Sequence, residues 1–170
     1  MSTRERLAAL WRQRVLAPIV AQLRQGITPE KIALTLALGI VCGVFPILGA
    51  TTVLCGLAAL LLRLNQPLIQ LVNYLLTPLH VALLLPFYRA GEHLFGTQPV
   101  PIFSIAELVQ RFEAGPARFV VDYGLVGVYG IVVWLLLAAP LAALLYLLLR
   151  PLLRRLSRRQ GPGGAPLASG

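Results

Sequence analysis

The stretch Ile32–Leu62 reads IALTLALGIVCGVFPILGATTVLCGLAALLL and carries no charged residue over 31 positions. The segment Phe45-Pro46-Ile47-Leu48-Gly49 interrupts it, and the helical pieces are Ile32–Phe45 with 14 residues and Thr51–Leu62 with 12, or about 21 and 18 Å as helices. Neither piece crosses about 30 Å of hydrocarbon unaided. The stretch therefore predicts a broken, re-entrant hairpin over residues 32–62 that enters and leaves the membrane on the same side.

Two further uncharged runs, Leu64–Tyr88 and Tyr123–Leu149, follow this stretch. Each is long enough to cross a bilayer as one helix. Apolar residues make up 58% of the chain and charged residues 12%, which is far from the composition of a soluble domain. The sequence predicts an all-α, polytopic helical membrane protein with the re-entrant hairpin, two full spans at 64–88 and 123–149, and short interfacial helices. The lipid bilayer is its first expected partner.

Charged residues set the expected orientation. Basic residues dominate both the first 31 positions and the segment after Leu149, whereas the connection 89–122 is poor in them. Because cytoplasmic segments are enriched in Lys and Arg, we expect both termini in the cytoplasm and 89–122 as an outer loop. The net charge of +9 flanks the spans rather than forming a basic stripe, so nucleic acid is not an expected partner.

Outside the spans, local signals predict shorter elements. Residues 1–27 are expected to form a cytoplasmic amphipathic segment, and Thr28-Pro29 to cap the first hairpin helix in a membrane domain over 28–149. Within the outer loop, Ser104 and Glu107 form a capping box ahead of a short amphipathic helix. Residues 150–170 are expected to be a cytoplasmic tail, basic and then disordered.

A polar stripe runs along 64–88. Its members, at spacings of four, three, four and three, are Gln66, Gln70, Asn73, Thr77 and His80. On one continuous helix these spacings define a single face, which must contact protein or water rather than lipid. Two interpretations stay open: hydrogen bonding between packed helices, or one wall of a polar pocket.

The helix break supplies the other side of that candidate pocket: Pro46, Gly49, Thr51 and Thr52. A half-helix that starts near Thr51 presents free N–H groups and a positive dipole end, which suit an anionic headgroup or solute. The threonine hydroxyls would add donors to such a site, or would only cap the helix.

Small residues mark expected packing positions, within one chain or between copies of a homo-oligomer; they are Gly39, Gly43, Gly124, Gly127 and Gly130. Cys42 and Cys55 are expected to be small core residues.

Catalytic chemistry has little support in the pattern. No Asp or Glu occurs in the three uncharged runs, and His80 has no partner at a spacing that would specify a base and an orienting group. We therefore predict no catalytic residue, no metal and no cofactor, and we do not expect an enzyme.

The order of these motifs resembles that of DUF2062, a family of uncharacterised bacterial membrane proteins. The resemblance rests on Thr28-Pro29, Gly39, Gly43, Pro46-Ile47-Leu48-Gly49, Asn65-Gln66-Pro67, Thr77-Pro78 and Tyr88-Arg89-Ala90-Gly91. Members commonly have Asn-Pro at Thr77-Pro78 and often Gln or His near Ala50-Thr51. The resemblance implies a location in the bacterial inner membrane. Some members are joined to glycosyltransferase domains, which implies a partner in envelope biosynthesis.

Two functions are compatible with this sequence. The first is a small transporter, or a protein that handles lipids or envelope precursors, with a pocket between the Pro46–Gly49 break and the polar face of 64–88. The second is a non-catalytic membrane scaffold or accessory subunit whose polar stripe is interhelical packing.

Overall fold

The computed structural model describes residue 17, residues 27–98, residue 100 and residues 105–159. This part of the chain contains no strand and is built from α3 (Pro29–Gly43), α4 (Ala50–Leu61), α5 (Gln66–Leu75), α6 (Thr77–Leu94), α7 (Ile105–Ala114) and α8 (Pro116–Arg159). The all-α prediction is confirmed for the described residues. Nearly all of the predicted segment 1–27, and the tail residues 160–170, lie outside them.

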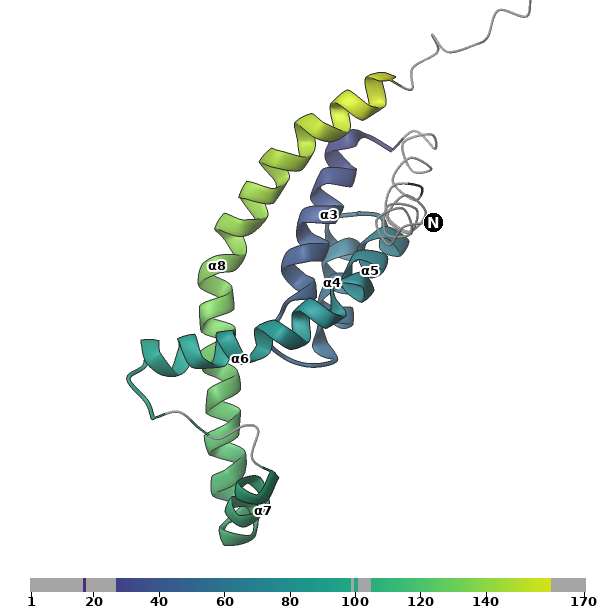
Figure 1. The fold of residues 1–170 in the computed structure, drawn as a ribbon. Helices are drawn as coiled ribbons and strands as arrows, with labels where there is room; N and C mark the ends of the chain where they lie inside the picture. Colours follow the sequence, from purple (N-terminus) through teal and green to yellow (C-terminus); the bar gives the residue numbers. More distant parts are fainter. Residues whose placement is uncertain (1–16, 18–26, 99, 101–104, 160–170) are drawn as a thin grey trace, which may run out of the picture.

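Helix α8 is the longest of the described helices. Its 44 residues extend over about 66 Å, and α3, α6 and α7 all pack against it (Figure 1). Among the described helices, α8 alone is long and apolar enough to cross a membrane by itself. The expected span 123–149 lies inside α8, and the helix continues past both of its ends. Charged side chains end an apolar run, but they do not interrupt helical hydrogen bonding.

The first turns of α3 pack against the last turns of α8, and the two helices run antiparallel (Figure 1). Glu30 forms ion pairs with Arg150 and Arg154, and Leu153 is buried beside the first turns of α3. Hydrogen bonding to Arg154, together with the nearby positive charges, holds the pKa of Glu30 below its usual value. Residues 150–159, the basic part of the expected tail, continue α8 as a helix, and Leu153 attaches this part to α3.

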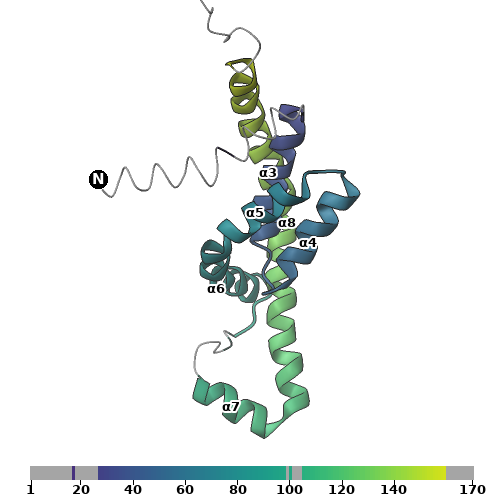
Figure 2. The same cartoon turned by 90° about the vertical axis from the view of Figure 1, so that its right-hand side faces the viewer.

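Helices α3 and α4 run in opposite directions on either side of the break at residues 44–49 (Figure 1). Helix α5 packs against both of them. A shared core of Cys42, Cys55, Ala59 and Ile69 lies between the three helices. The short helices thus form one compact group beside α8 (Figure 2).

The expected full span 64–88 is not one helix. The chain bends by 65° between α5 and α6, and Pro78 lies in the first turn of α6. Proline has no N–H and its ring collides with the carbonyl four residues earlier, so it starts a new helix more readily than it continues one. The prediction of two full spans is not confirmed: α5 and α6 would supply a second crossing only as a bent pair.

Helix α6 passes across α8 rather than along it (Figures 1 and 2). The two backbones approach at Gly91, where an added Cβ would lie 2.7 Å from the carbonyl carbon of Tyr129. Much of the expected outer loop 89–122 is helical. Helix α6 continues to Leu94, α7 covers Ile105–Ala114 and α8 begins at Pro116. Ser104, the expected cap of α7, lies outside the described residues.

Candidate functional site

Three amide side chains of the polar stripe join α5 to α4. Gln66 donates from Nε2 to the Gly56 carbonyl over 2.9 Å, and Gln70 donates from Nε2 to the Thr52 carbonyl over 3.0 Å. Asn73, which is 4% exposed, donates from Nδ2 to the Thr52 hydroxyl over 3.2 Å. A carbonyl oxygen has two lone pairs, so it can accept these bonds in addition to a helical one. The α4–α5 seam is thus held by side-chain bonds to backbone and hydroxyl groups.

The other two members of the stripe lie beyond the bend, so the five residues do not share one helix face. The Thr77 hydroxyl is directed back to the Asn73 carbonyl over 3.5 Å, and the residue is exposed. His80 is 4% exposed and its ring lies against the backbone of Phe45. Within the described residues, its Nε2 has no hydrogen-bond partner. Reading Thr77 and His80 as continuing the α5 face was wrong because Pro78 redirects the helix.

The helix break is tied to α6. Pro46 is buried, and its carbonyl accepts a 2.8 Å hydrogen bond from the hydroxyl of Tyr88. Gly49 closes the break at φ +82°, a left-handed conformation that costs glycine little. Thr51, in the first turn of α4, is 6% exposed. The turn is therefore a fixed part of the packing between the hairpin and α6.

A tryptophan of α8 closes the other side of the break. Trp134 donates from Nε1 to the Val41 carbonyl over 2.9 Å, and its ring meets Phe45 edge to face at 4.9 Å. Carbonyls in the last turn of a helix lack intrahelical partners, and this bond satisfies one of them. Neither Tyr88 nor Trp134 was expected in this region. The signal in the sequence is an aromatic residue with a polar group inside an apolar run, because a buried Tyr O–H or Trp N–H usually has a hydrogen-bond partner.

Two of the glycines singled out from the sequence face α5. A Cβ at Gly39 would lie 3.1 Å from the side chain of Val72, and one at Gly43 would lie 3.4 Å from Asn73. Both positions let α3 approach α5 closely.

The three α8 glycines differ from one another. A Cβ at Gly130 would lie 2.8 Å from the ring of Tyr88. Gly124 and Gly127 face open space, since no atom of the described chain lies within 4 Å of a Cβ built there.

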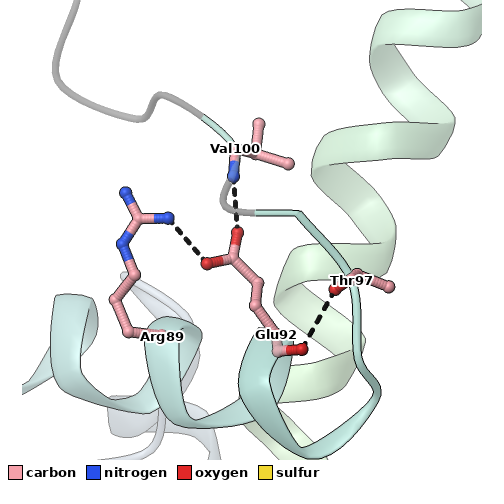
Figure 3. A network of polar contacts seen from close by, with 4 residues as sticks. All are labelled: Arg89, Glu92, Thr97 and Val100. Carbon is pink, nitrogen blue, oxygen red and sulfur yellow. Dashed lines mark hydrogen bonds and ion pairs between the residues drawn. The ribbon is translucent and has the colours of Figure 1, made fainter.

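A second polar group surrounds Glu92 near the end of α6 (Figure 3). Arg89 contacts Oε2 of Glu92 from Nη1 over 2.6 Å, while the Val100 N–H donates to Oε1 over 2.8 Å. The Glu92 side chain is 2% exposed, and that of Arg89 is 37% exposed. The Glu92 carbonyl also accepts from the Thr97 N–H and hydroxyl, over 2.9 and 3.3 Å. Sequence reasoning missed this group because it assigned residues 89–122 to a loop.

Two hollows adjoin this network. The first, the Arg89 hollow, measures about 480 Å³ and is lined by Arg89, Glu92, His93, Gly96 and Thr97. The second, the α8 hollow, measures about 190 Å³ and is lined by Thr97, Gln98, Val100, Leu125, Val126 and Tyr129. Thr97 lines both, so the two hollows adjoin, and the exposed lining of each is mainly apolar.

Cys42 of α3 and Cys55 of α4 are buried free thiols that share one core cluster. Across the described ranges, no three His, Cys, Asp or Glu side chains gather as a metal site would require.

A sequence model of one bacterial family matches residues 13–161 of the chain, and its description reads "Uncharacterized protein conserved in bacteria (DUF2062)". The match covers α3 to α8 completely. No curated protein and no solved structure matches the chain.

Proposed function

Since the chain belongs to the uncharacterised bacterial family DUF2062, whose description assigns no activity, we propose from its geometry that it is an integral membrane protein acting as a non-catalytic scaffold or accessory subunit. Helix α8 crosses the bilayer, and the group α3 to α6 is embedded beside it. The location is the bacterial inner membrane with both termini in the cytoplasm.

The exposure of large apolar side chains carries the membrane assignment. Among the described residues, more of these side chains are exposed than are buried. They include Leu60 and Leu61 on α4 and Leu136, Leu147 and Leu148 on α8. A soluble monomer rarely exposes contiguous apolar surface of this extent, whereas lipid removes the cost of exposing it.

The pairing in the α4–α5 seam favours a scaffold over a pocket at the helix break. Gln66, Gln70 and Asn73 each donate to a group on α4, and Tyr88 bonds the turn itself. Amides that are paired with protein need no solute, so this part of the stripe supports interhelical packing. A scaffold of this size is expected to act with partners: further copies of the chain, for which Gly124 and Gly127 leave room, and a protein of envelope biosynthesis.

Cysteine accessibility in intact cells tests this proposal. The native Cys42 and Cys55 are replaced by alanine, and single cysteines are placed at Gln110 on α7, Ser157 near the end of α8, and Asn73 in the seam. An impermeant thiol reagent should label Gln110→Cys from outside, Ser157→Cys only after permeabilisation, and Asn73→Cys in neither case.

Each departure has a distinct meaning. Labelling of Asn73→Cys would show that water reaches the seam and would favour the transporter or lipid-handling alternative. Labelling of the Ser157 variant before permeabilisation would overturn the orientation, and release of the chain from membranes by alkaline washing would overturn the membrane assignment.

A further inference from the structure

The Arg89 hollow lies near the end of α6, where this helix meets the beginning of the uncharged run of α8. The crossing places Gly91 against Tyr129, six positions after the run begins at Tyr123. Phe95 stacks on the Tyr129 ring at 4.5 Å, which extends the contact toward the hollow. In the membrane placement proposed above, this is the depth of the lipid headgroups.

The polar side of the hollow has the chemistry of a phosphate site. Arginine carries five N–H donors in a planar fork that matches a phosphate group, and the contacts of the described residues engage only Nη1 of Arg89. His93, one helical turn after Arg89, lines the same hollow, as does Thr97. The Arg89 guanidinium and the His93 ring thus line one space, together with Thr97 and with the Glu92 carboxylate that pairs with Arg89.

Glu92 positions Arg89 but contacts only its Nη1, so the other N–H groups of the guanidinium stay available to a ligand. One carboxylate oxygen contacts the guanidinium and the other accepts from Val100, so neither oxygen is left without a partner. Figure 3 shows the carboxylate between Arg89 and Val100, with Thr97 bonded to the Glu92 carbonyl. A buried ion pair of this kind holds the partly exposed guanidinium at the wall of the hollow.

The adjoining α8 hollow favours an amphiphile over a free anion as the ligand. Leu125, Val126 and Val100 contribute apolar walls, and Thr97 borders both spaces. A phosphate held at the Arg89 side chain would therefore have apolar surface around it, in the Arg89 hollow and in the adjoining α8 hollow. Inorganic phosphate or a sugar phosphate has no group to fill that surface, whereas the glycerol and first methylene groups of a phospholipid do.

We propose that the Arg89 hollow binds the phosphate of an anionic phospholipid, with the glycerol and the beginning of an acyl chain against the α8 hollow. Arg89 is the principal ligand, His93 assists it, and Glu92 is the positioning residue. This inference rests on the membrane location proposed above, although it does not depend on the scaffold assignment.

Native mass spectrometry of the full purified chain, titrated with dioleoyl-phosphatidylglycerol in a neutral detergent, measures this binding directly. Replacing Arg89 alone would leave Glu92 buried without its ion pair, which is strongly destabilising. The informative variant is therefore the double substitution Arg89→Gln with Glu92→Gln, which removes both charges. Arg118→Gln, on an exposed position of α8, is the matched control. Circular dichroism during heating reports folding separately.

The double variant should fold like the unmodified chain and bind phosphatidylglycerol about tenfold more weakly, since a hydrogen bond to a charged group contributes about that factor. Arg118→Gln should leave the affinity unchanged. Adding Glu92→Gln to Arg89→Gln should restore thermal stability but not lipid binding, whereas a purely structural arginine would allow both to be restored.

Equal affinity of the double variant and the unmodified chain would overturn the proposal. Equal loss in Arg118→Gln would show a general effect of surface charge and would also overturn it. Glycerol phosphate that competes as effectively as the lipid would assign the site to a free phosphate ester instead. A chain that stays in alkali-washed membranes but shows no preference for phosphatidylglycerol over phosphatidylcholine would keep the membrane location and refute the lipid site.

Discussion

Replacing Gly91 by alanine should loosen the crossing between α6 and α8. The added Cβ would lie 2.7 Å from both the carbonyl carbon and the Cβ of Tyr129, and 2.8 Å from the Tyr129 carbonyl oxygen. Ordinary van der Waals contact begins at 3.4 Å. Two of these atoms belong to the α8 backbone, so a side-chain rotation cannot relieve the overlap and the helices must separate.

The magnitude follows from two opposed effects. Alanine favours a helix interior over glycine by about 0.5–1 kcal/mol, whereas overpacking costs about 1–3 kcal/mol. Gly124→Ala is the matched control, because it brings the same helix preference and its Cβ would meet nothing within 4 Å in the described chain. The difference in unfolding free energy between the two variants therefore isolates the overpacking cost, which we expect near the upper end of its range.

Unfolding by SDS from a mild detergent, followed by tryptophan fluorescence, measures this difference. Trp134 contacts the end of α3, so its emission reports separation of the hairpin from α8. Gly91→Ala should unfold at lower SDS than the unmodified chain, and Gly124→Ala at equal or higher SDS. Coincident curves for the two variants would show that α6 and α8 do not cross at this distance.

Three further outcomes follow from the packing. Trp134→Phe keeps an aromatic ring but leaves the buried Val41 carbonyl without its donor, so SDS unfolding followed by circular dichroism should show a loss of about 1–3 kcal/mol; an unchanged midpoint would show that this bond does not stabilise the fold. A permeant oxidant should form a disulfide between Cys42 and Cys55 within one chain, and counting the free thiols under denaturing conditions checks this. Two thiols that remain free would refute the α3–α4 contact. The pKa of Glu30 is lowered by the hydrogen bond from its arginine partner on α8, so its contribution to stability is complete above the unfolded-state pKa and is lost as pH falls through the folded-state value. Glu30→Gln should flatten this acid dependence, and an identical pH profile in that variant would contradict the assignment.

The helix break and the cap at Thr28 could be predicted because their signals are local. Pro46 and Gly49 interrupt a run that otherwise has no reason to stop, and Thr28 precedes a proline at the first helical turn. Pro78 is also a signal of the bend in the sequence, but the hydropathy of 64–88 favours one continuous span. Hydropathy measures only whether a segment tolerates lipid, and a bent helix tolerates it as well as a straight one.

Contacts between distant segments were outside the reach of sequence patterns. The bond from Trp134 to Val41 joins residues 93 positions apart, and no spacing rule covers such a pair. The position of Glu92 was missed for a related reason. A carboxylate after an apolar run indicates a solvated boundary, and only the fold shows that Arg89 and Val100 enclose it.

The depth of α6 in the proposed membrane follows from the same residues. The Arg89 side chain is 37% exposed, so it requires the headgroup layer, whereas the paired amides of the α4–α5 seam can lie in hydrocarbon. The Gly91 contact then sets Tyr129 of α8 at that surface. From Tyr129 to Arg150, which pairs with Glu30, α8 rises by about 32 Å, close to the thickness of about 30 Å of a hydrocarbon core. In the proposed placement, one bilayer thus fits between the α6 crossing and the Glu30 ion pairs, which agrees with an Arg89 hollow at the level of the lipid phosphates.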